Sequence, residues 1–279
     1  MNVRFWGTRG SFPTPGRATQ RYGGNTACVE VGVDGPNHLI VLDAGSGIRM
    51  LGMEVGPTLE RVDLLLTHLH MDHIIGLGFF APLFRRNLDV HIWGPGSTTL
   101  VLRERLARYL SPPLFPVRLR DLPCRLSLHD VPLGTFEVPD MQVSAALVCH
   151  PGPTVGYRLE DGRGTLVYLP DHEPALGTRR FPENERWTSG YALAADADML
   201  IHDSQYSDDE YNAHVGWGHS SIAHAIAFAE LTSADHLVAF HHDPSHDDVR
   251  LDALYERVLR KARGLLISTA REGMTFALP

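Results

Sequence analysis

The chain has 279 residues and a net charge of −8 with histidine counted as neutral. Its composition, 43% hydrophobic and 21% charged, is that of a globular protein with ample length for a large core. The acidic balance argues against a strongly basic nucleic-acid-binding face, and no run of about 18 apolar residues predicts a membrane span. The three cysteines are widely spaced, which argues against a disulfide framework, and there is no apolar leader segment. We therefore expect a cytoplasmic protein.

Short apolar strands alternate with helices along the chain. We predict early strands at 2–6, 27–33, 38–43, 63–67 and 89–93, with helices at 46–54 and from Ser97 to about Leu110. The proline-rich stretch 112–123 is followed by five short strands between 124 and 169. The last third predicts a loop over 174–187, helices at 187–195, 221–231 and 247–263, and strands at 198–202, 235–240, 265–268 and 274–278. This order predicts an α/β fold, a four-layer αββα sandwich of two mixed sheets with outer helices, as a single domain over 1–279.

Four candidate metal ligands lie within six residues at the end of one predicted strand. His68 and His70 are two residues apart, so on extended backbone they point the same way. Asp72 and His73 follow where the chain turns into a helix, and they can face the same point from another side. Three imidazoles and a carboxylate converging on one point suit one or two divalent ions, zinc above all, although Mn²⁺ and Fe²⁺ also accept such ligands.

Three further candidates each end an apolar strand: His150 after VSAALVC, Asp171 after LVYLP and His241 after LVAF. Loops at strand ends are where a rigid scaffold presents functional groups. Taken singly, a histidine at a strand end is more often an ordinary polar loop residue. His242 adjoins His241, and strand alternation lets only one of the two point inward. His172 and Glu173 follow Asp171 directly and are candidates for contacts around the ligands or with substrate.

The run His-x-His-x-Asp-His at 68–73 resembles the signature of the metallo-β-lactamase superfamily. The resemblance implies the αββα fold and two metal ions. It implies that one ion is held by His68, His70 and His150, the other by Asp72, His73 and His241, with Asp171 bridging them. No cysteine occupies a matching ligand position, which argues against hydrolysis of β-lactams.

Two later stretches, LIHDSQ at 200–205 and GWGHSS at 216–221, are similar to the phosphodiesterase branch of that superfamily. This branch includes ribonuclease Z and small-molecule cyclic phosphodiesterases. The similarity implies a metal-bridging hydroxide as nucleophile and Asp72, Asp203 and His219 as catalytic residues. Asp203 would orient His219, and His219 would protonate the leaving oxygen as a general acid. The alternative for His219 is a polar residue that merely precedes a helix.

The sequence favours a small phosphodiester substrate, such as a cyclic nucleotide or a cyclic sugar phosphate. Ribonuclease Z grips tRNA with a basic flexible arm, and the insert-like stretches 111–123 and 174–187 are not rich in lysine or glycine. Processing of tRNA 3′ ends, lactone or thioester hydrolysis, and metal-free binding remain alternatives. Arg9, Asn25 and Thr26 could bind a phosphate or simply hold the long loop 7–24. A homodimer is common in this branch and is compatible with the resemblance.

Overall fold

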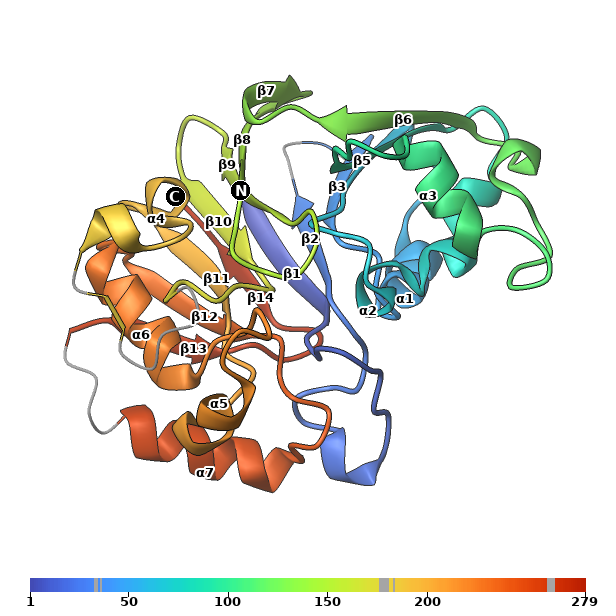
Figure 1. Ribbon diagram of the computed structural model, residues 1–279. Coiled ribbons are helices and arrows are strands. Elements are labelled where there is room, and N and C mark those ends of the chain that lie inside the picture. Colours follow the sequence, from blue (N-terminus) through green and yellow to red (C-terminus); the bar gives the residue numbers. More distant parts are fainter. Residues whose placement is uncertain (33–34, 36, 176–180, 183, 260–263) are drawn as a thin grey trace.

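The computed structural model describes residues 1–32, 35, 37–175, 181–182, 184–259 and 264–279 (Figure 1). Two seven-stranded sheets form its centre. The first has the spatial order β14 (Thr275–Ala277), β1 (Asn2–Gly7), β2 (Cys28–Gly32), β3 (His38–Leu42), β4 (Arg61–Leu65), β5 (Asp89–Pro95) and β6 (Arg125–Val131). The second has the order β13 (Leu266–Thr269), β12 (His236–Phe240), β11 (Met199–Asp203), β10 (Thr165–Leu169), β9 (Val155–Glu160), β8 (Met141–Leu147) and β7 (Gly134–Val138).

Each sheet is parallel in one half and antiparallel in the other. In the first sheet β3, β4, β5 and β6 run parallel, whereas β14, β1, β2 and β3 pair antiparallel. In the second sheet β10 to β13 run parallel and β7 to β10 pair antiparallel. The prediction of two mixed sheets is therefore confirmed.

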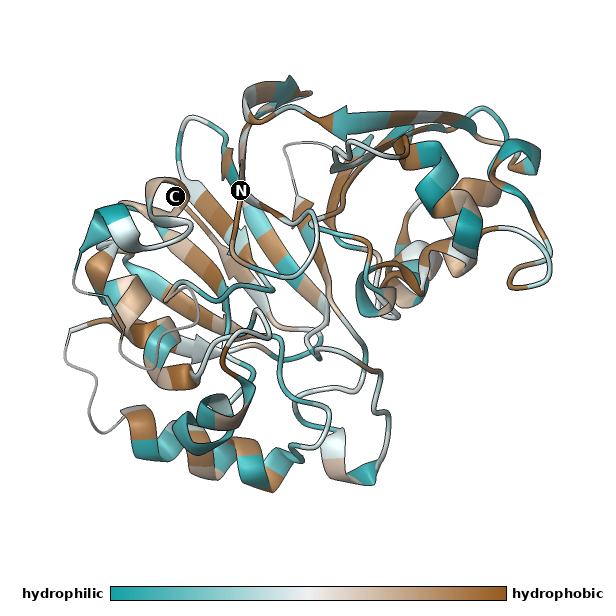
Figure 2. Ribbon diagram, viewed as in Figure 1, coloured by the Kyte–Doolittle hydropathy of each residue, from teal (hydrophilic) through white to brown (hydrophobic). Residues whose placement is uncertain are grey.

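Side-chain alternation along the strands creates three apolar layers. Between the sheets, Phe5 and Leu42 of the first pack with Tyr168 and Phe240 of the second in one buried cluster. The outer face of the first sheet is covered by α1 (Ile48–Glu54), α2 (Met71–Ile74) and α3 (Leu102–Tyr109), and that of the second by α4 (Tyr191–Ala194), α6 (Ile222–Leu231) and α7 (Asp248–Leu259) (Figure 1). Brown apolar stripes run along the strands (Figure 2). This is the predicted αββα sandwich.

Several predicted boundaries were wrong. The third helix begins at Leu102 rather than after Ser97, whose hydroxyl instead bonds Thr99. The predicted helix at 187–195 is split into a 3₁₀ turn, η5 (Glu185–Trp187), and α4, because Gly190 between them adopts a left-handed conformation with φ of 73°. The predicted helix 247–263 is confirmed over Asp248–Leu259, and its predicted last residues, 260–263, lie outside the described part.

Helix α5 (Asp208–His214) was not predicted, although its capping box of Ser207 and Glu210 is visible in the sequence. Shorter 3₁₀ turns are η1 (Arg17–Thr19), η2 (Leu77–Phe79), η3 (Ala81–Phe84) and η4 (Leu119–Asp121). Among the helices in the described ranges, none has the length and apolarity needed to cross a membrane.

The carboxyl ends of the parallel strands of both sheets face one edge of the sandwich. Asp203 ends β11, while Asp171 and His241 follow β10 and β12 in the second sheet. His68 follows β4 in the first sheet. The two sheets thus bring loops from distant parts of the sequence to a common site.

Candidate metal centre and active site

The seven side chains predicted as ligands lie together. Two groups each have ligand atoms within 4.8 Å of one another: His68, His70, His150 and Asp171 in the first, and Asp72, His73, Asp171 and His241 in the second. Each group draws members from both sheets, because residues 68–73 follow β4 and the other three follow strands of the second sheet. Asp171 belongs to both groups.

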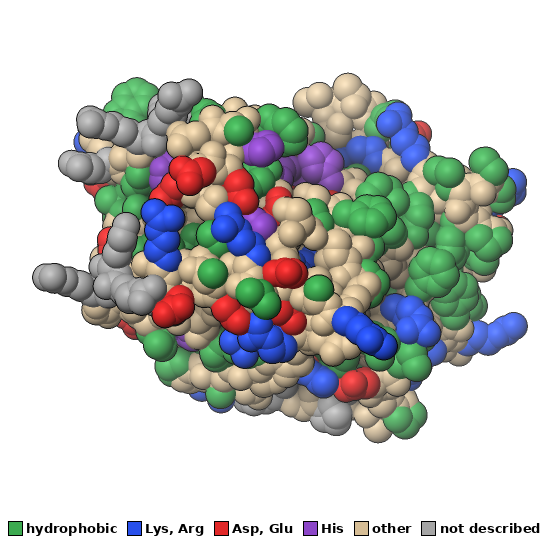
Figure 3. Space-filling view, turned by 90° about the horizontal axis from the view of Figure 1, so that it is seen from below, with side chains coloured by type: hydrophobic (Ala, Val, Ile, Leu, Met, Phe, Trp, Pro, Cys, Tyr) green, Lys and Arg blue, Asp and Glu red, His purple; other side chains and the backbone are tan. Residues whose placement is uncertain are grey.

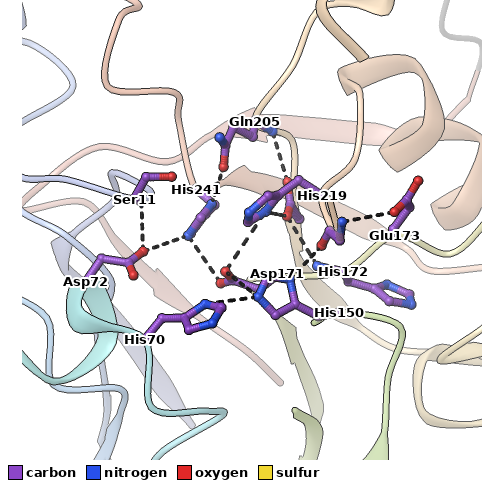
Figure 4. Close-up of polar contacts among 12 residues, drawn as sticks. Ser11, His70, Asp72, His150, Asp171, His172, Glu173, Gln205, His219 and His241 are labelled. Carbon is purple, nitrogen blue, oxygen red and sulfur yellow. Dashed lines mark hydrogen bonds and ion pairs between the residues drawn. The ribbon is translucent and has the colours of Figure 1, made fainter. Parts of the chain in front are cut away.

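The two carboxylate oxygens of Asp171 face different groups (Figure 4). Its Oδ1 lies 2.9 Å from His73 Nε2 and 3.2 Å from His241 Nε2. Its Oδ2 lies 3.7 Å from His68 Nε2 and 3.8 Å from His150 Nε2. Asp171 has 2% of its surface exposed, and its two oxygens are divided between the two groups.

Outer partners fix the orientation of the histidines. The Nδ1–H groups of His73, His150 and His241 donate to Asp43 (2.8 Å), the Gly218 carbonyl (2.9 Å) and the Gln205 side-chain carbonyl (3.0 Å), respectively. Because these partners are acceptors, Nε2 is left unprotonated and turned inward in the neutral ring. Ligating histidines in metalloproteins are held in the same way.

Several inward atoms lack an ordinary partner. Among the described residues, His68 Nε2, His73 Nε2 and Asp171 Oδ1 are buried and make no hydrogen bond of good geometry, although His73 Nε2 and Asp171 Oδ1 lie 2.9 Å apart as an ion pair. Buried polar atoms are rarely left unpaired, and an unpaired one calls for an explanation such as an ion. Nitrogen and oxygen donors converging in this way fit divalent metal ions.

Burial and the surrounding charges set the protonation states of the site. Burial, followed by the positive charge of His73, lowers the pKa of His68 well below its ordinary value, so this ring is neutral at neutral pH. Burial would also lower the pKa of His73, but the carboxylates of Asp171, Asp72 and Asp43 raise it well above its ordinary value, so a cation bound there would displace a proton from this ring. Burial alone would raise the pKa of Asp171, but His241, His73 and His68 hold it well below its usual range. Neutral imidazoles and ionised carboxylates are the forms in which these side chains bind metals.

His219 lies beside the predicted ligands and is held by its own carboxylate partner (Figure 4). Its Nδ1–H donates to Asp203 Oδ2 at 2.7 Å, and Asp203 is itself fixed by the backbone N–H of Gln205 at 3.0 Å. Burial would lower the pKa of His219, but the Asp203 carboxylate outweighs it, and the pKa rises to about 9. The ring Nδ1 is 3.9 Å from Asp171, so the predicted proton donor adjoins the predicted ligands.

Glu173 holds the loop that carries His219. The carboxylate is buried and accepts the Tyr211 hydroxyl at 2.8 Å and the backbone N–H groups of Gly216 at 2.9 Å and Gly218 at 3.0 Å. Gly218 also receives the His150 bond described above. Glu173 therefore sets the position of a predicted ligand and of the predicted general acid at once.

Two sequence features make room for the predicted ligands. A side chain at Gly10 would collide with the His241 ring, which lies directly against it. A side chain at Gly218 would collide with the His150 ring, and Gly218 also has a left-handed φ of 88°. His241 itself adopts φ of 60°, an uncommon value for a residue with a Cβ, and this conformation turns it out of β12.

The neighbouring histidines and the early arginine have other roles. His242 is buried away from the groups and bonds the Ala270 carbonyl at 2.9 Å. His172 Nδ1 and His202 Nε2 are 2.9 Å apart, as a buried ring pair. Arg9 is fully buried and donates from Nε to the Gly23 carbonyl at 2.8 Å, so it holds the long first loop rather than facing a substrate.

Sequence reasoning missed the residues around the predicted ligands. Asp43 joins His73 to Thr67 and to the Tyr168 hydroxyl at 3.0 Å, although its place at the end of strand HLIVL resembles that of the predicted ligands. Ser11 donates its backbone N–H to Asp72 at 2.8 Å, and no sequence signal indicates this contact. Gln205 lies within the LIHDSQ stretch that was singled out for Asp203.

The fold and the site together define a metal-dependent hydrolase. A family model described as the beta-lactamase superfamily domain matches residues 38–242, and the chain belongs to this superfamily. The predicted superfamily and fold are therefore confirmed, as is the prediction of a hydrolase.

Several relatives of known name resemble the chain over most of its length. The chain is 28% identical to ribonuclease Z of Bradyrhizobium diazoefficiens, over 83% of this chain and 89% of that protein. It is 27% identical to ribonuclease Z of Myxococcus xanthus, over 100% of this chain and 98% of that protein. The structure of human tRNase Z, short form, shares the fold, with a TM-score of 0.70, 20% identity and complete coverage of both chains. The resemblance to the branch that includes ribonuclease Z is thus confirmed.

Proposed function

We propose that the chain is a phosphodiesterase that works with two divalent ions, Zn²⁺ by preference. His68, His70 and His150 would hold one ion, Asp72, His73 and His241 the other, and Asp171 would bridge them. The observation that carries this proposal is the division of the two Asp171 oxygens between two ligand groups. A carboxylate shared in this way is suited to a two-metal site.

The reaction follows from the positions of the side chains. When bound, the two ions would activate a water molecule and stabilise negative charge on the phosphate oxygens. His219 presents the proton for the leaving oxygen, because Asp203 occupies its Nδ1 and leaves Nε2 free to face the substrate. A phosphodiester releases an alkoxide, which benefits from such a proton donor more than a thioester's leaving group does. The Asp203–His219 pair therefore supports phosphodiester hydrolysis over thioester hydrolysis.

Precursor tRNA is the substrate class favoured by the names of the relatives. The Myxococcus relative covers the full chain and the Bradyrhizobium relative 83% of it, and human tRNase Z shares its fold. A 3′-processing endoribonuclease is accordingly one candidate for the specific activity.

A small cyclic phosphodiester is the second candidate, and a different observation favours it. The alignment with the Myxococcus protein runs over 318 positions, more than the 279 residues present here, so that relative has residues without a counterpart in this chain. The net charge of −8 also disfavours an extended RNA interface.

The test uses metal-loaded protein and two substrate sets, with Asp72→Ala as the control. One set is a precursor tRNA with a 3′ trailer, and the other contains 3′,5′- and 2′,3′-cyclic nucleotides. Turnover of either set that is lost in the variant would support the phosphodiesterase proposal and select the substrate class. A protein that binds two metal ions per chain but cleaves neither set would contradict it.

A further inference from the structure

A pocket of about 370 Å³ opens beside the predicted proton donor. Its lining includes Tyr206, His214, Trp217 and His219, together with the carboxylates of Glu210 and Asp243. The volume lies within the range of about 300–1,000 Å³ that is usual for small-molecule sites. The space-filling view shows histidine side chains in a hollow with acidic side chains close by (Figure 3).

One wall of this pocket is a continuous series of rings. Tyr206 stacks on His214 with centroids 4.7 Å apart and an interplanar angle of 16°, and His214 meets Trp217 edge to face, also at 4.7 Å. Tyr206 in turn contacts His219 at 6.0 Å. Trp217 ends the series at the rim with 60% of its surface exposed, so a large aromatic face is available to a ligand.

The loop that carries Trp217 is fixed on both sides. The backbone N–H groups of Gly216 and Gly218 both donate to the buried Glu173 carboxylate, and the Trp217 N–H donates to the His214 carbonyl at 3.0 Å. A ring presented from a fixed backbone loses little conformational entropy when a ligand stacks on it. The exposure of Trp217 is thus combined with a preorganised position.

The reaction geometry says which part of a substrate would occupy this pocket. His219 lines the pocket, and in the proposed reaction it protonates the leaving oxygen, so the leaving alcohol would lie there. The carboxylates of Glu210 and Asp243 oppose a further phosphate in this pocket. Their oxygens already accept hydrogen bonds from the protein, Glu210 from Ser207 and Asp243 from Ser245. An uncharged group with a flat ring fits this combination.

We propose that Trp217 is a specificity-determining residue that stacks on the base of a nucleoside whose hydroxyl is the leaving group. This inference rests on the proposed phosphodiesterase function and narrows it to nucleotide substrates, rather than sugar phosphates without a base. Bases stack on exposed aromatic side chains with little dependence on their identity, so the preference is for a nucleobase as such.

The test measures binding rather than turnover, by calorimetry on the metal-loaded full chain. Adenosine 5′-monophosphate and ribose 5-phosphate share the phosphate and sugar and differ by the base. Wild-type protein should bind the nucleotide more tightly, and Trp217→Ala should weaken nucleotide binding roughly 10- to 100-fold while leaving ribose 5-phosphate unchanged. Trp217→Phe should retain most of the affinity.

Trp187 supplies a matched control, because it is 70% exposed on η5 and does not line this pocket. Trp187→Ala should leave both affinities unchanged. Equal nucleotide affinity in wild type and Trp217→Ala, including no binding by either, would overturn the inference, as would an equal loss for both ligands. Nucleotide binding that depends on Trp217, in a protein that cleaves neither substrate set, would instead contradict only the proposed phosphodiesterase activity.

Discussion

Replacing His219 by alanine tests the proposed mechanism most directly. A positioned general acid contributes roughly 10²–10⁴-fold to the rate of a reaction that needs it. His219 is buried and its Nδ1 is fixed by Asp203 at 2.7 Å, so we expect a value near the middle of that range. For a nucleoside leaving group, kcat should fall about 10³-fold, which corresponds to about 4 kcal/mol of transition-state stabilisation.

The size of the loss should depend on the leaving group. A nitrophenolate is stable as an anion and needs no proton, so the same variant should lose no more than about 10-fold on a nucleotide p-nitrophenyl ester. Asp203→Asn keeps the imidazole but removes the carboxylate that orients it, and its loss should be smaller than that of His219→Ala. Single-turnover rates on the two esters, with metal content measured for each variant, give the comparison.

His129→Ala serves as the control, because His129 lies in the edge strand β6, stacks on Trp93 of β5 and belongs to neither predicted ligand group. It should change neither rate. An equal loss on both esters in His219→Ala, at unchanged metal content, would refute the role of proton donor. No loss on either ester would refute it as well.

Three further predictions concern the metal ions, the loop and the fold. Asp171→Asn should bind fewer than two zinc ions per chain by elemental analysis, because a neutral amide cannot replace a buried bridging anion. It should also lose the rise in Tm that zinc gives the wild type. An unchanged zinc stoichiometry would contradict the bridging role of Asp171. Glu173→Gln should lower kcat about 10-fold, because the side-chain NH₂ of glutamine would meet one of the backbone N–H groups that now donate to the carboxylate. The exposed Glu137→Gln should leave kcat unchanged. An unchanged kcat in Glu173→Gln would argue against a positioning role. Asp63 is buried, which would raise its pKa, but bonds from His38, Arg61 and Trp93 lower the pKa below the ordinary 3.8. Asp63→Asn should therefore lower the free energy of unfolding at pH 7, measured with urea, by about 2–3 kcal/mol. The difference between the two proteins should shrink as the pH falls below about 4, where the carboxyl of the unfolded chain takes up a proton before that of the folded chain. A difference that does not depend on pH would contradict this reasoning.

The assembly of the predicted ligands was accessible from the sequence because strand ends are local features. Apolar runs that stop at His150, Asp171 or His241 can be seen without coordinates, and parallel strands bring such ends to one edge. The roles of the residues that hold the predicted ligands in place could not be predicted from the sequence. Asp43 ends its strand in the same manner but orients His73, and only the distance between side chains reveals the difference.

The errors in the fold have local physical causes. Ser97 is of a residue type that is favoured at helix N-caps, but the helix begins five residues later, at Leu102. Its N-cap residue is Val101, which makes no side-chain cap hydrogen bond. Conversely, Ser207 and Glu210 form a complete capping box that went unrecognised because helix α5 has only seven residues. Propensity rules rank candidate boundaries, and packing against the sheet decides among them.

The origin of each ligand group in both sheets has a mechanical consequence. The distances between the predicted ligand atoms of the two sheets depend on how one sheet lies against the other. That alignment is set by the apolar layer between the sheets, in which the ring centroids of Phe5 and Phe240 are 5.9 Å apart. A shear of the sheets by a fraction of an ångström would pull both groups out of register together. Residues of the apolar layer, which lie in neither ligand group, would therefore influence the affinity of the proposed metal site.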